Sequence, residues 1–186
     1  MTKIMLNTRT LSMNVKPEGE NTLLENLKNE SVAIAKDSPR WLAELRQNSF
    51  SRFAELGIPT TRHEEWKYFN LAALNARRFR LPVSAGIKDE KLLQDYFEDN
   101  EVNVVFINGI FSEKFSNVHR LPKGIAVLTL AQALEKEQAT VSDFYKRTTP
   151  NDPEPFVSLN TALHTNGAFI RIVDKAVVEQ VVHVFY

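Results

Sequence analysis

Apolar residues recur at helical spacing near the start of the chain. Within residues 21–36, Leu23, Leu24, Leu27 and Ile34 fall near one face of a helix, and the charged side chains lie elsewhere. An apolar stripe of this period is typical of a helix with one face packed against a core. We therefore predict a first amphipathic helix over residues 21–36.

A second helix is predicted directly after the first. Ser38 would cap it, Pro39 would occupy its first position, and Gly57 would end it. Its apolar positions recur at helical spacing: Trp41, Leu42, Leu45, Phe53 and Leu56. Its charged residues are predicted to form a solvated face: Arg40, Glu44, Arg46 and Arg52.

Shorter elements follow in the middle of the chain. Residues 89–99 indicate a short helix, and residues 102–107 an apolar strand. Asn108-Gly109 after this strand is a strong signal for a hairpin. Residues 124–130 indicate another strand, and residues 131–139 a helix.

The pattern changes after residue 148. Three prolines between Thr148 and Pro155 predict a loop, and residues 156–166 a helix ended by Gly167. Residues 168–173, 177–178 and 181–186 then indicate short strands, with a turn at residues 174–175.

The spacing of the last predicted strands is compatible with strands stacked in successive layers. Ile170 and Val182 are 12 residues apart, as are Ile172 and Val184, although two units do not establish a repeat. The apolar strand that ends at Tyr186 has no Pro or Lys to blunt its edge, and such an edge is a template for another strand.

Composition narrows the function classes. In 186 residues, Lys and Arg balance Asp and Glu at 23 each, which argues against a nucleic-acid or anionic membrane surface. Arg77-Arg78-Phe79-Arg80 is the only basic cluster. No apolar run reaches the roughly 20 residues that span a bilayer. We read the N-terminus as a tail of a cytoplasmic protein.

The absence of cysteine limits the chemistry of the chain. Iron–sulfur clusters are held chiefly by Cys thiolates, so this chain cannot hold a cluster by thiolates of its own. The four histidines are far apart in sequence and form no metal-ligand pair. We therefore expect no cofactor or metal bound by this chain.

The run of residues 58–70 crowds charged and aromatic side chains together. Thr61 and Glu64 have capping-box spacing, which predicts a short helix starting near residue 62. Residues 63–67 read H-E-x-x-K, which lacks the second imidazole of a zinc protease helix. We predict that the aromatic residues pack inward: Trp66, Tyr68 and Phe69. An alternative is a small soluble enzyme that uses His63 with Glu64 or Glu65 as an acid/base pair.

Three segments of the chain, taken in order, together resemble the SufB/SufD family of iron–sulfur cluster assembly proteins, and specifically its SufD branch. The segments are residues 59–68, residues 104–111, and residues 156–172 running on into 177–180. The resemblance implies a non-enzymatic partner of SufB-like proteins and of the SufC ATPase. It implies an α+β fold in which a helical N-terminal region with a small β element leads into the first strands of a β-helix. Family members of this kind are longer, and their ATPase-contact and cluster-related regions have no counterpart in this chain.

These considerations divide the chain into three parts. Residues 1–37 form a tail and the first helix, residues 38–150 an α+β domain, and residues 151–186 a helix with the truncated start of a β-helix. Either the chain is a fragment or a partner, including a second copy, covers its last strand. The predicted partner edge consists of Val181, Val182, Val184, Phe185 and Tyr186.

Overall fold

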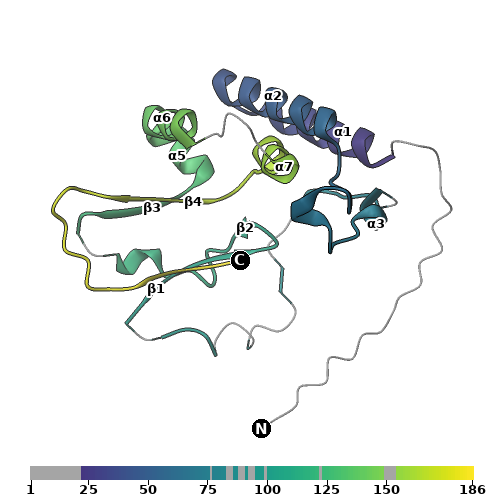
Figure 1. Ribbon diagram of the computed structural model, residues 1–186. Helices are drawn as coiled ribbons and strands as arrows, with labels where there is room; N and C mark the ends of the chain where they lie inside the picture. The colour runs from purple at the N-terminus through teal and green to yellow at the C-terminus, as the bar shows by residue number, and fades with distance from the viewer. Residues whose placement is uncertain are drawn as a thin grey trace, which may run out of the picture.

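The computed structural model describes residues 22–75, 77–82, 86–87, 91, 95–98, 100–121, 123–148 and 154–186. Figure 1 shows most of the helices in the upper part of the view and the short strands below them. Helices and strands share one chain without regular alternation, so the fold is α+β as predicted.

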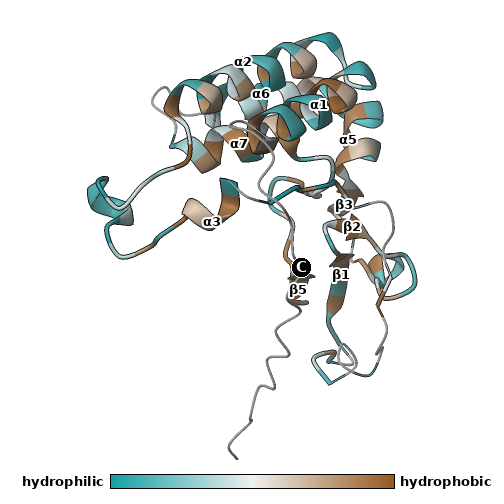
Figure 2. Cartoon of the chain, turned by 90° about the vertical axis from the view of Figure 1, so that its right-hand side faces the viewer, coloured by the Kyte–Doolittle hydropathy of each residue, from teal (hydrophilic) through white to brown (hydrophobic). Residues whose placement is uncertain are grey.

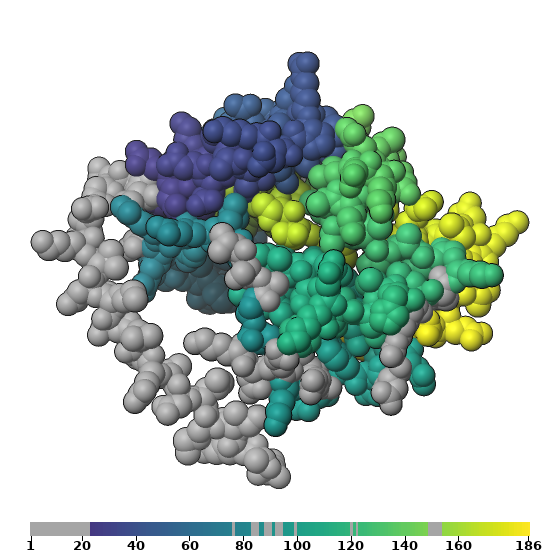
Figure 3. Space-filling view, turned by 180° about the vertical axis from the view of Figure 1, so that it is seen from behind, coloured from purple at the N-terminus to yellow at the C-terminus, as the bar shows by residue number. Residues whose placement is uncertain are grey.

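Three helices enclose the first core. They are α1 (Thr22–Lys36), α2 (Arg40–Leu56) and α7 (Pro155–Leu163). In Figure 3, α7 lies between the purple and blue helices and the green region of residues 130–148. Both predicted N-terminal helices are confirmed, because their apolar stripes meet in this core. Its buried residues are Leu23, Leu27, Phe50, Phe53 and Ala162.

The ends of α2 agree only in part with the sequence prediction. Gly57 ends the helix with φ of 69°, and its N–H donates to the carbonyl of Phe53 at 2.8 Å. Ser38 is not the cap, since its Oγ donates to the carbonyl of Ile34 at 2.8 Å. The hydroxyl therefore serves the end of α1, and Pro39 occupies the N-cap position of α2 without a side-chain bond.

A second core lies under two short helices, α5 (Leu130–Lys136) and α6 (Gln138–Thr148). Its buried residues are Leu130, Ala133 and Val141. A capping box starts α5, in which Gln132 N–H donates to Thr129 Oγ1 at 3.2 Å. The single helix predicted over residues 131–139 is wrong at its end, because Glu137 leaves helical geometry with φ of −131°.

The strands form two small sheets. In the first, β1 (Val102–Ile107) lies between β2 (Ile110–Phe111) and β5 (Val182–Phe185). In the second, β3 (Ile125–Thr129) pairs antiparallel with β4 (Ala168–Ile172). Every residue of β1 is buried, and β1 and β5 lie side by side in this sheet (Figure 2). The predicted strands at residues 102–107 and 124–130 are confirmed.

The predicted hairpin is also confirmed. Asn108 and Gly109 both have positive φ, 53° and 76°, as the tight turn between β1 and β2 requires. The turn predicted at Asp174-Lys175 forms as well, with φ of 64° at Lys175.

The C-terminal segment departs from the prediction in three places. Residues 177–178 form no strand. Gly167 does not end α7, since the helix already stops at His164 with ψ of 131°. Strands β4 and β5 pair in different sheets rather than with each other. The β-helix therefore stays a prediction.

Some predictions fall on residues outside the described ones. The helix predicted over residues 89–99 is described only at residues 91 and 95–98, and the loop of residues 148–155 only at its two ends. The tail also lies outside, up to residue 21. The division into three parts stays a prediction.

Candidate functional site

The outer edge of β5 is the predicted partner edge. Strand β5 pairs in parallel with β1, from Val102↔Val182 to Val105↔Phe185, and Val102 N–H donates to Val181 O at 2.9 Å. In the described part of the chain, no strand pairs with the other side of β5. A parallel ladder uses the backbone groups of alternate residues, so those of Val182 and Val184 point outward. This side of β5 therefore offers free donors and acceptors.

The side chains along this edge are partly apolar surface. Val181 is 50% exposed, Val184 39% and Tyr186 77%, whereas Val182 and Phe185 are half-buried. Tyr186 still stacks one face on Phe106, with centroids 4.7 Å apart. All five predicted edge residues thus lie on or beside one strand, and three of them are exposed.

The acid/base alternative finds no support in the geometry. Thr60 N–H donates to His63 Nδ1 at 3.1 Å, and Glu64 pairs with Lys67. Among the described residues, no carboxylate pairs with His63, and Glu65 is exposed. The imidazole is thus held by its own turn and lacks a carboxylate to orient it.

The turn around residue 64 also corrects two predictions. A single 3₁₀ turn, η1 (Glu64–Trp66), replaces the short helix, and no capping box forms at Thr61. Trp66 is half-buried, 5.2 Å from the ring of Phe156, but Tyr68 is 85% exposed and Phe69 62% exposed. One turn is too short to bury a whole aromatic face. Tyr68 and Phe69 therefore lie on an exposed surface rather than in a core.

A buried polar cluster was missed by the sequence prediction. Arg46, assigned to the solvated face of α2, is only 4% exposed. Its Nη2 donates to the carbonyl of His164 at 2.7 Å, and its Nη1 donates to Ser38 Oγ. Arg46 follows Leu42 by four residues and precedes Phe50 by four, so helical spacing already placed it in the apolar stripe.

Arg46 sits where two helices end. The carbonyl of His164 follows the last turn of α7, and Ser38 in turn binds the carbonyl of Ile34 in the last turn of α1. Helix C-termini carry partial negative charge, which stabilises a cation there. Burial lowers the pKa of Arg46 from its usual value, and the nearby Tyr145 opposes this shift. We interpret Arg46 as a structural connection among α1, α2 and α7.

His164 extends this cluster to α6. Its Nδ1 lies 3.1 Å from the carbonyl of Asn160 and 3.0 Å from that of Thr161, so Nδ1 is the protonated nitrogen. Its Nε2 then accepts from the hydroxyl of Tyr145 at 2.5 Å. Burial and the charge of Arg46 lower the pKa of His164, and burial raises that of Tyr145.

An open hollow of about 590 Å³ lies beside this cluster. Arg46 and Thr165 line it together with the carboxylates Asp37 and Glu135. Arg46 Nε is buried and has no hydrogen-bond partner among the described residues, so it could donate to an anion. The two carboxylates would repel an anion in the same hollow. We therefore assign no ligand to this hollow.

The described residues contain neither a group of metal ligands nor a helix that could span a membrane. No group of three or more His, Asp or Glu side chains there is arranged to hold a metal ion. None of the helices in that part of the chain combines the length and apolar character needed to cross a bilayer.

Comparison with known proteins completes the description of the chain. Residues 18–184 match the family described as the SufBD protein N-terminal region. The chain is also similar to an iron–sulfur cluster assembly SufBD family protein of Synechocystis sp., with 26% identity over 161 residues. The match covers 84% of this chain and 35% of that relative, so the chain spans about a third of its length.

Proposed function

This chain belongs to the SufBD N-terminal family, and we propose that it is a component of an iron–sulfur cluster assembly machinery that acts through protein partners. The carrying observation is the family match, which extends over residues 18–184. The name of the Synechocystis relative, an iron–sulfur cluster assembly SufBD family protein, supports the same process. The partners we propose are SufB-like and SufC-like proteins.

The role we propose is non-enzymatic and of the SufD type. No cysteine occurs in these 186 residues, so any thiolates that hold a cluster would have to come from outside this chain. The isolated imidazole of His63 supports the same view, because its described contacts are with its own turn. We propose a cytoplasmic location, since a chain without disulfides suits a reducing compartment.

We further propose that the two sheets begin a β-helix. The parallel pairing of β5 with β1 supports this, since stacked rungs pair in parallel. The face of β4 opposite Phe169 also remains apolar and open, with Ile170 41% exposed and Ile172 55% exposed. One rung cannot cover its own apolar face, so a further strand, from the rest of a SufBD protein or from a partner, would complete it.

A binding measurement tests the proposed function. The full-length protein should retain SufB-like and SufC-like proteins of the same cell in a pull-down with purified components. If it retains neither, the proposed function is wrong.

A variant pair tests the β5 edge separately. Val184→Lys should weaken association, because a charged side chain on the edge disfavours strand pairing. Val32→Lys is the matched control, since Val32 is 51% exposed on α1, away from the edge. Equal binding by both variants would remove the edge from the interface.

A further inference from the structure

The segment after α2 carries more positive than negative charge, although the whole chain is neutral. We call the described residues 58–75 and 77–82 the basic arm. It contains two carboxylates, Glu64 and Glu65, and five cationic side chains, all of them exposed. The cations are Arg62, Lys67, Arg77, Arg78 and Arg80.

Three arginines of the basic arm differ from other surface arginines. Within the described residues, no carboxylate pairs with Arg62, Arg77 or Arg80. By contrast, four surface arginines outside the arm each have a carboxylate within 3.2 Å. These pairs are Arg40–Glu44, Arg52–Glu55, Arg147–Asp143 and Arg171–Glu137.

Exposed aromatic rings accompany these arginines. Tyr68 and Phe69 are 85% and 62% exposed, and Phe79, between Arg78 and Arg80, is 42% exposed. Arginine and aromatic side chains are the residue types that most often carry the binding energy of protein interfaces. Surface that is both apolar and cationic is therefore available on one segment.

The basic arm is attached to the helical core. Leu74, in the short helix α3 (Ala72–Asn75), packs against the first core, and Trp66 contacts Phe156. The backbone N–H of Phe79 donates to Asn26 Oδ1 on α1 at 2.8 Å. Figures 1 and 2 place α3 beneath the helices and away from the strands. The core thus holds the arm in place, which lowers the entropy cost of binding.

We propose that the basic arm is a docking surface for an acidic segment of a protein partner in cluster assembly. This inference rests on the proposed function and assigns it a surface distinct from the edge of β5. Charge complementarity identifies the partner's chemistry, because the unpaired guanidinium groups suit carboxylates in bidentate geometry. The aromatic rings would cover apolar side chains beside those carboxylates. The neutral chain as a whole argues against a nucleic-acid footprint.

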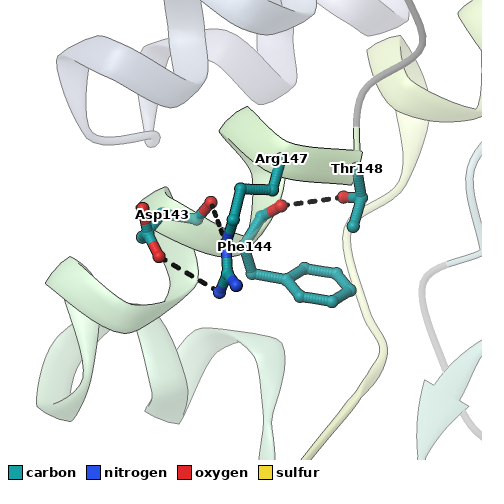
Figure 4. Close-up of polar contacts among 4 residues, drawn as sticks. All are labelled: Asp143, Phe144, Arg147 and Thr148. Atoms are coloured by element: carbon teal, nitrogen blue, oxygen red, sulfur yellow. Dashed lines mark hydrogen bonds and ion pairs between the residues drawn. The ribbon is translucent and has the colours of Figure 1, made fainter.

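The test compares two double charge reversals of the full-length protein. Arg77→Glu/Arg80→Glu changes the basic arm, and Arg40→Glu/Arg147→Glu is the matched control. Figure 4 shows that Arg147 lies on α6 with its own ion pair to Asp143, so the control alters charge elsewhere. Binding of purified SufB-like and SufC-like proteins is measured by calorimetry at about 0.05 M and 0.5 M salt, where screening differs strongly.

The arm variant should bind a partner about tenfold more weakly at low salt, with the difference shrinking at high salt, while the control stays near wild type. Equal binding by the two variants, with wild type bound, overturns the docking surface but leaves the proposed function standing. Failure of wild type to bind either protein overturns both. Tight, arm-dependent binding of a single-stranded RNA oligomer, or arm-dependent self-association in sedimentation, overturns the acidic protein partner. Circular dichroism melting confirms that both variants are folded.

Discussion

Replacement of Arg46 is the sharpest test of the packing in this fold. Arg46→Met keeps most of the apolar stem but removes the donors to His164 O and Ser38 Oγ. Each hydrogen bond from a charged group contributes about 1.5–3 kcal/mol. Relief of the guanidinium's desolvation offsets part of this loss. Because the acceptors stay behind in partly buried surroundings, we expect a net destabilisation of about 2–3 kcal/mol.

Urea denaturation followed by circular dichroism measures this loss. With a slope near 2 kcal/mol per M, the midpoint should fall by about 1–1.5 M while the slope stays constant. Arg46→Lys should fall between wild type and Arg46→Met, since Lys keeps the charge but not the planar fork. The control is Arg40→Met on the same helix, whose side chain is 93% exposed, and its midpoint should equal that of wild type. A midpoint for Arg46→Met equal to that of wild type would refute the reasoning.

Three further predictions concern His164, its partner and the hairpin. The pKa of His164 is lowered on folding, so below about pH 6.5 the unfolded state binds more protons than the folded state. The free energy of unfolding should therefore decrease as the pH is lowered through this range. His164→Gln should flatten this dependence of the unfolding free energy on pH. An unchanged slope would contradict this. Tyr145→Phe removes the donor to His164 and should lower the melting temperature by about 2–4 °C, for a loss near 1 kcal/mol. Gly109→Ala should cost about 1 kcal/mol because φ is 76° there, whereas Gly167→Ala, without positive φ, should be neutral; equal effects would refute the argument.

Features set by neighbouring residues were predictable from the sequence. The hairpin at Asn108-Gly109 and the end of α2 at Gly57 depend on backbone conformations that glycine adopts without steric cost. Strand β1 was predictable because five of its six residues are apolar and an Asn-Gly turn follows it directly. In each case, the physical cause lies within a few positions of its effect.

Features set by distant residues were not predictable in this way. Helical spacing placed Arg46 in the apolar stripe, but its acceptor on His164 lies 118 positions away, so the charged side chain was assigned to solvent. Ser38 was assigned to the wrong helix end because its hydroxyl serves Ile34 and Arg46 together. The aromatic run was assigned to the interior, although residues 64–66 make only one 3₁₀ turn and leave Tyr68 outside. The local sequence around these residues does not show which distant residues they contact in the folded chain.

The predicted partner edge depends both on neighbouring residues, which set the strand, and on distant residues, which set its pairing. A run rich in β-branched residues correctly placed a strand near the last residues, now β5 over Val182–Phe185. That run did not show that β1 would be the neighbour of the strand. Nor did the pattern predict that Tyr186 would stack on Phe106.

The pairing of β1 with β5 has a consequence for synthesis on the ribosome. Val102 and its register partner Val182 are separated by 80 positions, so translation at about 5–20 residues per second delivers the second strand roughly 4–16 s after the first. During that interval the hairpin with β2 can form, but the other side of β1 has no native neighbour. An apolar strand waiting in this way is a natural target for a holding chaperone, and slower elongation between these positions should increase misassembly.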